Sequence, residues 1–287
     1  MRRAAIDIGT NTVKLLVADV QNGQIIPVVS TDAPTRLGEG VGETKRLAAH
    51  AITRTIETIS HYVADAKGLG AETIVAFTTS AARDAVNRHE FLDGVHRACG
   101  LDVQAVSGER EAELVFRGVC SDPAWTGQRI LVLDVGGGSA EFILGKSGVI
   151  ESRQSLPLGA VRLTERFRET GFAELTAFLR QTLHGALQDY HAGLWRMIGT
   201  GGSIVTLAQM KHGRADHATL SLHDLRVLVT SLDAMSLDER KRVPRLPPER
   251  ADIIVAGAAV FLFAMEALGA VELTVSVRSL RYGALLD

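Results

Sequence analysis

The sequence has few of the residues that mark disulfide-stabilised, zinc-binding or membrane-spanning proteins. Among its 287 residues there are only two cysteines, Cys99 and Cys120, which form neither a disulfide framework nor a metal-binding spacing. The nine histidines form no H-E-x-x-H motif or His/Cys cluster, which argues against a zinc enzyme. The most apolar stretch, residues 253–265, is too short to cross a bilayer, so it predicts a buried helix.

Strong charge of either sign is also missing. The formal net charge of −2 gives no case for a surface that coats nucleic acid or seeks a membrane. The acid at position 7 falls where a signal peptide would need an apolar region. We therefore expect a cytoplasmic protein without a nucleic-acid or membrane partner, large enough for one large domain or two modest ones.

A glycine-rich turn between two apolar runs, residues 130–146, is the most informative feature that is present. The first run ends at Asp134, and the second is an alternating run that carries Glu141 on its outward-facing side. Glycines permit φ > 0 and let an anion approach backbone N–H groups. The short run after the turn predicts a strand, whereas a Walker A or Rossmann fingerprint would open a helix. The pattern favours a phosphate-binding hairpin over an ordinary one, with turn residues Gly136, Gly137, Gly138 and Ser139.

The same pattern occurs 127 residues earlier, within residues 4–20. At that offset Asp7 aligns with Asp134, and the turn residues align as Gly9 with Gly136, Thr10 with Gly137, Asn11 with Gly138 and Thr12 with Ser139. The repetition predicts two similar α/β lobes, each presenting a turn to a shared cleft. We place the first lobe at residues 1–120, with residues 276–287 returning to it, and the second at residues 121–275.

A third glycine loop precedes a predicted helix at Gly201, Gly202 and Ser203. A glycine-rich loop that leads into a helix N-terminus is suited to bind an anion, although a tight strand–helix turn explains the same residues. Arg83 follows a predicted strand at residues 73–78, in a helix that we expect Thr79 or Ser80 to cap. It would lie near the carboxyl end of that strand, where ligands of α/β proteins gather.

Other helices are predicted from apolar periodicity and capping signals. They cover residues 44–67, 172–194, 222–235 and 249–268, and Ser221 with Asp224 forms a capping pair for the third. A further helix after Gly108 carries Glu109, Glu111 and Glu113 close to its start. Their charges complement the helix dipole whether or not one of them has a chemical role.

Together these parts suit phosphoryl chemistry. Three glycine-bearing turns facing one cleft would bind a ligand with several phosphates, and Asp134 and Glu141 offer the hard oxygens that Mg²⁺ prefers. Phosphoryl transfer depends on positioning, charge neutralisation and an oriented nucleophile. The sequence therefore predicts hydrolysis or transfer of a terminal phosphoryl group.

At this point the motifs resemble those of the exopolyphosphatase/guanosine pentaphosphate phosphohydrolase (Ppx/GppA) family. They are A-I-D-I-G-T-N-T, T-S-A-A-R-D-A-V-N, S-G-E-R-E-A-E-L, L-D-V-G-G-G-S-A-E and G-T-G-G-S, and they follow the order of the family along nearly the whole chain. The resemblance implies an α/β fold of two actin-like ATPase (ribonuclease H-like) lobes with the active site between them. It also implies Mg²⁺-dependent release of terminal phosphate.

The resemblance assigns roles to single residues. Glu111 matches the family glutamate that activates water, Asp134 and Glu141 match the metal and phosphate site, and Asn11 and Arg83 match polar groups of the first lobe. Asp7, the counterpart of Asp134, is a third candidate metal ligand. The chain resembles the short family members without a C-terminal helical domain, which favours short polyphosphate chains, and the family implies a homodimer. Arg278 and Tyr282 stand where family members often carry acids.

Several functions remain open on the sequence. The leading hypothesis is an exopolyphosphatase that releases orthophosphate from inorganic polyphosphate by attack of a water oriented by Glu111. The same chemistry on guanosine pentaphosphate is the nearest alternative. A kinase or ATPase of the same superfamily lacks support, because the chain has no evident insert for a sugar or a filament contact. A non-catalytic polyphosphate or alarmone sensor would place bases, not acids, at positions 111, 134 and 141.

Overall fold

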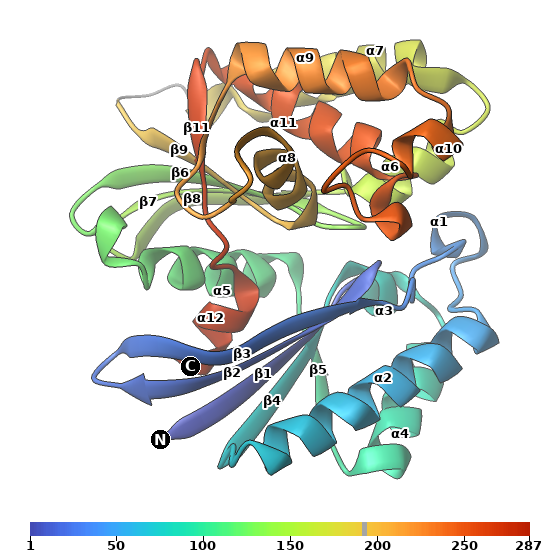
Figure 1. The fold of residues 1–287 in the computed structure, drawn as a ribbon, viewed down its shortest axis with the longest axis vertical. Coiled ribbons are helices and arrows are strands. Elements are labelled where there is room, and N and C mark those ends of the chain that lie inside the picture. The colour runs from blue at the N-terminus through green and yellow to red at the C-terminus, as the bar shows by residue number, and fades with distance from the viewer. Residues whose placement is uncertain (191–193) are drawn as a thin grey trace. The chain divides into compact units, whose positions relative to one another are not determined.

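The structure is a computed structural model that describes residues 1–190 and 194–287. The chain divides into two compact units. The first comprises Met1–Pro123 together with Arg278–Asp287, and the second comprises Ala124–Val277. Each unit has a mixed β-sheet with helices packed on it, as Figure 1 shows.

The first unit is built on a five-stranded sheet in the order β3-β2-β1-β4-β5. The first three strands form an antiparallel meander, and β4 and β5 continue the sheet in parallel with β1. The strands are β1 (Arg2–Ile8), β2 (Thr12–Gln21), β3 (Gln24–Pro34), β4 (Thr73–Thr78) and β5 (Val103–Ala105). The helices are α1 (Val41–Thr44), α2 (Ala49–Gly68), α3 (Ser80–Asp84), α4 (Arg88–Cys99), α5 (Gly108–Cys120) and α12 (Leu280–Leu285).

Alternation along β1 decides which side chains reach the apolar core of the first unit. Ile6 and Ile8 are buried together with residues of α2 and α4, so the intervening Asp7 projects from the opposite face. Helices α5 and α12 pack together. Gly118 and Gly283 permit this contact, since a Cβ at either position would clash with the backbone of the other helix or of its N-cap. This packing fixes the helix that carries Glu111.

The second unit has a six-stranded sheet in the order β10-β11-β9-β6-β7-β8. The strands are β6 (Arg129–Val135), β7 (Ala140–Lys146), β8 (Val149–Leu156), β9 (Arg196–Thr200), β10 (Thr219–Ser221) and β11 (Glu272–Val275). The helices are α6 (Ala160–Arg166), α7 (Gly171–Ala186), α8 (Gly202–His212), α9 (Leu222–Asp233), α10 (Leu237–Arg240) and α11 (Ile254–Leu268), with short 3-10 turns η1 (Pro123–Trp125), η2 (Gln188–Tyr190) and η3 (Pro248–Arg250).

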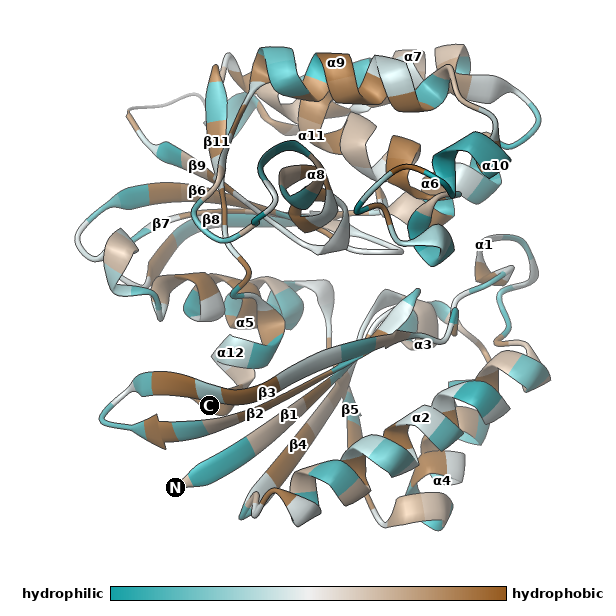
Figure 2. Cartoon of the chain, in the orientation of Figure 1, coloured by the Kyte–Doolittle hydropathy of each residue, from teal (hydrophilic) through white to brown (hydrophobic). Residues whose placement is uncertain are grey.

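The apolar helix α11 is the centre of the second unit. It packs against α6, α7, α8 and α9, and every residue from Ile254 to Met265 is buried. Figure 2 shows it as a largely hydrophobic helix, in contrast to the hydrophilic α10. The sequence-based expectation of a buried helix is confirmed. No helix among the described residues is both long and apolar enough to span a bilayer.

Element boundaries differ from the predictions where local signals overlap. Both predicted hairpins form, as β1–β2 and β6–β7. The helix predicted from residue 44 begins at Ala49, because Lys45 takes a left-handed conformation and separates α1 from α2. The helix predicted for residues 172–194 ends at Ala186, and residues 191–193 lie outside the described residues.

The capping predictions had two outcomes. Ser221 and Asp224 form the predicted capping box at the start of α9. Thr79 is the N-cap of α3, but its side chain makes no capping hydrogen bond, so the prediction of a side-chain cap there was wrong. The Thr79 amide instead donates to the Ile8 carbonyl at 3.4 Å, which fixes the start of α3 to the end of β1.

Candidate phosphate-binding loops and acidic site

The β1–β2 turn of the first unit is held by its own carbonyl oxygens. The Gly9 amide donates to the Thr12 carbonyl at 3.1 Å and closes the turn. The Thr10 carbonyl accepts from the Gly38 amide at 2.8 Å, and the Asn11 carbonyl accepts from the Thr35 and Arg36 amides at 3.0 and 2.9 Å. Backbone amides of the segment after β3 thus donate hydrogen bonds to the carbonyl oxygens of this turn.

The β6–β7 turn of the second unit repeats this arrangement with different donors. The Gly136 amide donates to the Ser139 carbonyl at 3.0 Å, and the carbonyls of Gly136 and Gly137 accept from the first amides of α6. The Arg162 Nε donates to the Gly138 carbonyl at 2.8 Å. Gly159, the residue before α6, has no room for a Cβ, which would overlap the backbone of Gly137 and Gly138.

These two turns present backbone donors. Within the described parts of the chain, the amides of Thr10 and Asn11 in the first turn, and of Gly137 and Gly138 in the second, have no acceptor in the protein. The carbonyls of Thr10, Asn11, Gly136, Gly137 and Gly138 accept hydrogen bonds from the protein, so these acceptors are already engaged. Successive backbone N–H groups of this kind form an anion-binding concavity.

The acids of the second turn face each other. Asp134 on β6 lies directly opposite Glu141 on β7 in the antiparallel register, a separation of about 4.5–5.5 Å between Cβ atoms. Glu141 is 1% exposed and accepts a hydrogen bond from Ser155 Oγ at 2.7 Å. The sequence placed Glu141 on an outward-facing position, whereas the structure buries it. Opposed like charges destabilise a strand pair, so this pair favours a bound cation.

The corresponding pair of the first turn is different. Asp7 lies opposite Lys14, and the Lys14 Nζ is 3.7 Å from the Asp7 carboxylate. Burial lowers the pKa of the Arg281 guanidinium, and the charge of Asp7 opposes this shift. Asp7 therefore already has cationic neighbours, while its counterpart Asp134 has a second carboxylate. The metal roles of Asp7, Asp134 and Glu141 all stay predictions.

The third glycine loop lies against the same acid. Gly201, with φ 98°, begins α8, and a Cβ on it would be 2.7 Å from Asp134 Oδ1. The register of β6 and β9 places Thr200 beside Asp134. The structure thus brings Gly201, Gly202 and Ser203 next to the β6–β7 turn within the second unit.

The predicted catalytic glutamate belongs to the first unit. Glu111 lies in the first turn of α5, whose N-cap Ser107 accepts a hydrogen bond from the Arg110 amide. Glu111 is 7% exposed, and its Oε2 is 3.2 Å from the Arg83 Nη1. The same guanidinium donates to the Val106 carbonyl at 3.2 Å. The arginine therefore holds the carboxylate in one position at the carboxyl ends of β4 and β5.

Thr10 and α3 join this group to the first turn. Thr10 Oγ1 is 2.9 Å from Ser80 Oγ, and Ser80 and Arg83 lie on the same short helix α3. Three elements that the sequence treated separately, the turn, α3 and α5, are therefore connected in the first unit. Glu109 of the same helix turn is exposed, which distinguishes it from the buried Glu111.

The structure adds two arginines that the sequence did not indicate. Arg162 of α6 bonds to the Gly138 carbonyl. Arg250 of η3 lies against Gly202, where a Cβ would clash with its guanidinium. Neither residue is in a recognisable motif, and both reach a glycine loop through tertiary packing. Arg278 instead has a structural role, since its Nη1 donates to the Ser121 carbonyl at 2.7 Å and its guanidinium lies over Tyr282.

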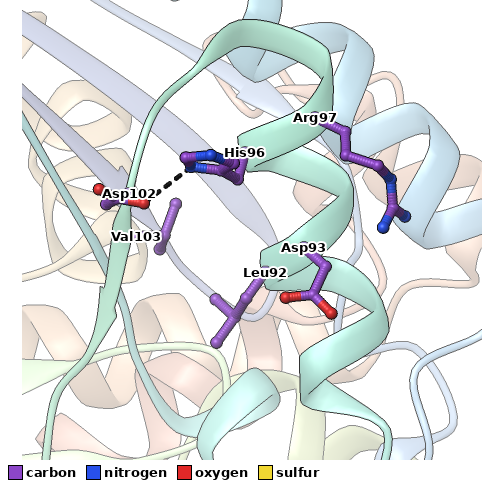
Figure 3. A pocket seen from close by; sticks show the side chains of 6 residues that line it. All are labelled: Leu92, Asp93, His96, Arg97, Asp102 and Val103. Carbon is purple, nitrogen blue, oxygen red and sulfur yellow. Dashed lines mark hydrogen bonds and ion pairs between the residues drawn. The ribbon is translucent and has the colours of Figure 1, made fainter.

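A surface depression elsewhere in the first unit contains none of the predicted residues. It lies between α4 and β5 and is shown in Figure 3. His96 Nδ1 and Asp102 Oδ1 are 2.9 Å apart at its edge, and both side chains are exposed. Its lining also combines Arg97 and Asp93 with the apolar Leu92 and Val103.

Comparison with known proteins identifies the class. The family model of the Ppx/GppA phosphatase family matches residues 16–287. The chain therefore belongs to this family, and it is an enzyme that hydrolyses phosphoanhydride bonds. Its two mixed sheets with helices form an α/β fold of the actin-like ATPase class.

Individual relatives agree with this assignment. The chain is 33% identical over 301 residues to Exopolyphosphatase 1 of Mycobacterium tuberculosis, covering 100% of the chain and 88% of that protein. It is 31% identical to the Ppx/GppA enzyme of Aquifex aeolicus, with a TM-score of 0.84 and coverage of 100% and 99%. A crystal structure of an exopolyphosphatase from Cytophaga hutchinsonii is 28% identical, with a TM-score of 0.90 and coverage of 100% and 97%.

Proposed function

We propose that this enzyme is an exopolyphosphatase, which releases the terminal orthophosphate of inorganic polyphosphate and acts on short chains. The observation that supports it most is the pair of turns with unsatisfied backbone donors at Thr10 and Asn11 and at Gly137 and Gly138. Two such turns suit a ligand with several phosphates. The expectation that both turns bind one substrate is part of the proposal.

The donor set of the second unit fits Mg²⁺. Asp134 and Glu141 supply two carboxylates at one position, and Mg²⁺ is usually held by one or two carboxylates together with substrate phosphates and waters. The bound ion would neutralise charge on the transferred phosphoryl group. Asp134 and Glu141 would hold it, while Arg250 and the Gly201–Ser203 loop bind phosphate oxygens.

Glu111 is proposed to orient the attacking water. Its carboxylate accepts a hydrogen bond from the water, whose oxygen attacks the terminal phosphorus as the bond to the bridging oxygen breaks. Glu111 takes the proton that the water loses, and the bridging oxygen leaves as a terminal oxygen of the shortened chain. The Arg83 guanidinium, 3.2 Å away, holds the carboxylate in one orientation. Asn11 and the amides of the first turn bind phosphate oxygens.

Phosphate release separates this proposal from the alternatives. The enzyme is supplied with Mg²⁺ and polyphosphates of graded length, with guanosine pentaphosphate and ATP as comparators. The proposal predicts release from polyphosphate without an acceptor, which a kinase or a sensor would not give. Faster turnover of guanosine pentaphosphate than of any polyphosphate would assign the same site to the nucleotide instead.

Cytoplasmic location and a homodimer also belong to the proposal, and both rest on the family resemblance. Light scattering on the purified protein measures the second directly. A mass equal to one 30.8 kDa chain at micromolar concentration would contradict the homodimer.

A further inference from the structure

Two arginines lie close to the far end of α8 in the second unit. Arg214 and Arg245 are exposed, and within the described residues neither side chain has a hydrogen bond or an ion pair. Their basic neighbours are engaged: the Lys211 Nζ is 2.8 Å from Asp224, and His212 bonds to the Thr219 carbonyl. The nearby Asp216 accepts from the Val277 amide.

The backbone holds Arg245 in a costly position. Its φ is 66°, a left-handed conformation that residues other than glycine adopt at a cost of about 1–3 kcal/mol. Its guanidinium is 3.5 Å from the position of a Cβ on Gly213, the C-cap of α8. Such strain persists where the surrounding structure requires it, and it is concentrated at functional sites.

A rigid connector links Arg245 to the phosphate loop. Arg250 contacts Gly202 at the start of α8, and Arg245 contacts Gly213 at its end, so residues 245–250 run antiparallel to the helix. The eleven residues of α8 span about 16 Å. Pro247 and Pro248 lie within this connector and restrict its backbone.

We propose that Arg214 and Arg245 form a distal phosphate subsite, which binds polyphosphate about 16 Å from the phosphates held at Gly202. The inference rests on the proposed function and deepens it. Guanidinium groups bind phosphate oxygens through two parallel hydrogen bonds. The affinity for polyphosphate rises with chain length until the chain spans α8, and longer chains gain nothing more from these residues.

A purely structural role for the two arginines makes a different prediction. Cations at a helix C-terminus stabilise the helix dipole, so their removal would lower the melting temperature and leave the dependence on chain length unchanged. If the two arginines form the subsite, their removal raises KM for long chains and has little effect on kcat or on KM for tripolyphosphate.

The test compares the double variant Arg214→Ala/Arg245→Ala with the wild type on long-chain polyphosphate and on tripolyphosphate. We expect KM for the long chain to rise about five- to tenfold, from two exposed charge pairs, with less difference at high salt. Arg168→Ala is the matched control, because it removes another exposed arginine of the same unit without a side-chain partner in the described chain. An unchanged ratio of the two KM values would overturn the subsite.

Calorimetric measurement of polyphosphate binding tests the subsite independently of the proposed function. If the wild type releases no phosphate from either substrate, the proposed function fails, and titration with long-chain polyphosphate still tests the subsite. Weaker binding of the long chain by the double variant, with binding of tripolyphosphate retained, supports it. Equal binding by wild type and double variant contradicts it.

Discussion

Asp134 and Glu141 face each other across the β6–β7 hairpin, at the position where Asp7 faces Lys14 in the β1–β2 hairpin. Both hairpins close their turns with equivalent hydrogen bonds, and equivalent residues lie 127 positions apart along the chain. The β1–β2 hairpin has an acid opposite a base at this position, whereas the β6–β7 hairpin has two acids. The duplicated elements have therefore diverged in the charge of the residue that faces the equivalent aspartate. Opposed carboxylates are tolerated where a cation binds between them.

Glu141→Gln should weaken the use of Mg²⁺ without lowering the stability of the protein. The substitution removes the repulsion with Asp134 and keeps the Ser155 hydrogen bond, so we expect an unchanged or higher melting temperature without Mg²⁺. The Mg²⁺ concentration needed for half-maximal phosphate release should rise at least tenfold, because one of two carboxylates is lost. Wild-type Mg²⁺ dependence in this variant would exclude Glu141 from the metal site.

Gly159→Ala should disturb the β6–β7 turn. The new methyl group overlaps the backbone of Gly137 and Gly138, and overpacking of this kind costs about 1–3 kcal/mol. We expect a lower free energy of unfolding in urea and weaker polyphosphate binding. Gly185→Ala, in α7 with open space around it, is the control and should raise stability by about 0.5–1 kcal/mol. Equal stability of both variants would contradict the close contact.

Asp224 should make stability depend on pH in the acid range. The Lys211 ammonium and the Ser221 hydrogen bonds lower the pKa of the Asp224 carboxyl to about 2 from its ordinary 3.8. The lowered pKa means that this stabilisation is present above pH 3.8 and is lost as the pH falls through about 2. We expect a contribution of about 1 kcal/mol after solvent screening. Unfolding curves of Asp224→Asn should lack it, and an identical pH dependence would refute the assignment.

The sequence predicted the features that depend on neighbouring residues. The 127-residue offset and the alternation around Asp7 and Asp134 were sufficient for both hairpins, and the family motif singled out Glu111. The contacts that complete the loops could not be predicted in this way. Gly159 and Arg250 reach the glycine loops through tertiary packing, and no periodicity or capping signal encodes such distances.

The burial of Glu141 shows a second limit. Alternation along β7 separates two faces of the strand, but β8 pairs with β7 and brings Ser155 beside the carboxylate. A strand pattern gives the face of a residue, whereas its exposure depends on the next strand. Helix periodicity likewise did not distinguish Glu109, Glu111 and Glu113, whereas the structure shows Glu111 buried and close to Arg83.

The central claim is that Glu111 orients the attacking water, and Glu111→Gln tests it most directly. Glutamine keeps the shape of the side chain but accepts the proton of the water poorly. We expect kcat for phosphate release from polyphosphate to fall about 10²–10⁴-fold, with polyphosphate binding by calorimetry within a few-fold of wild type. Glu109→Gln makes the same charge change in the same helix turn on an exposed residue, and it should keep near-wild-type turnover. Turnover close to wild type in Glu111→Gln would contradict the proposed role of this residue.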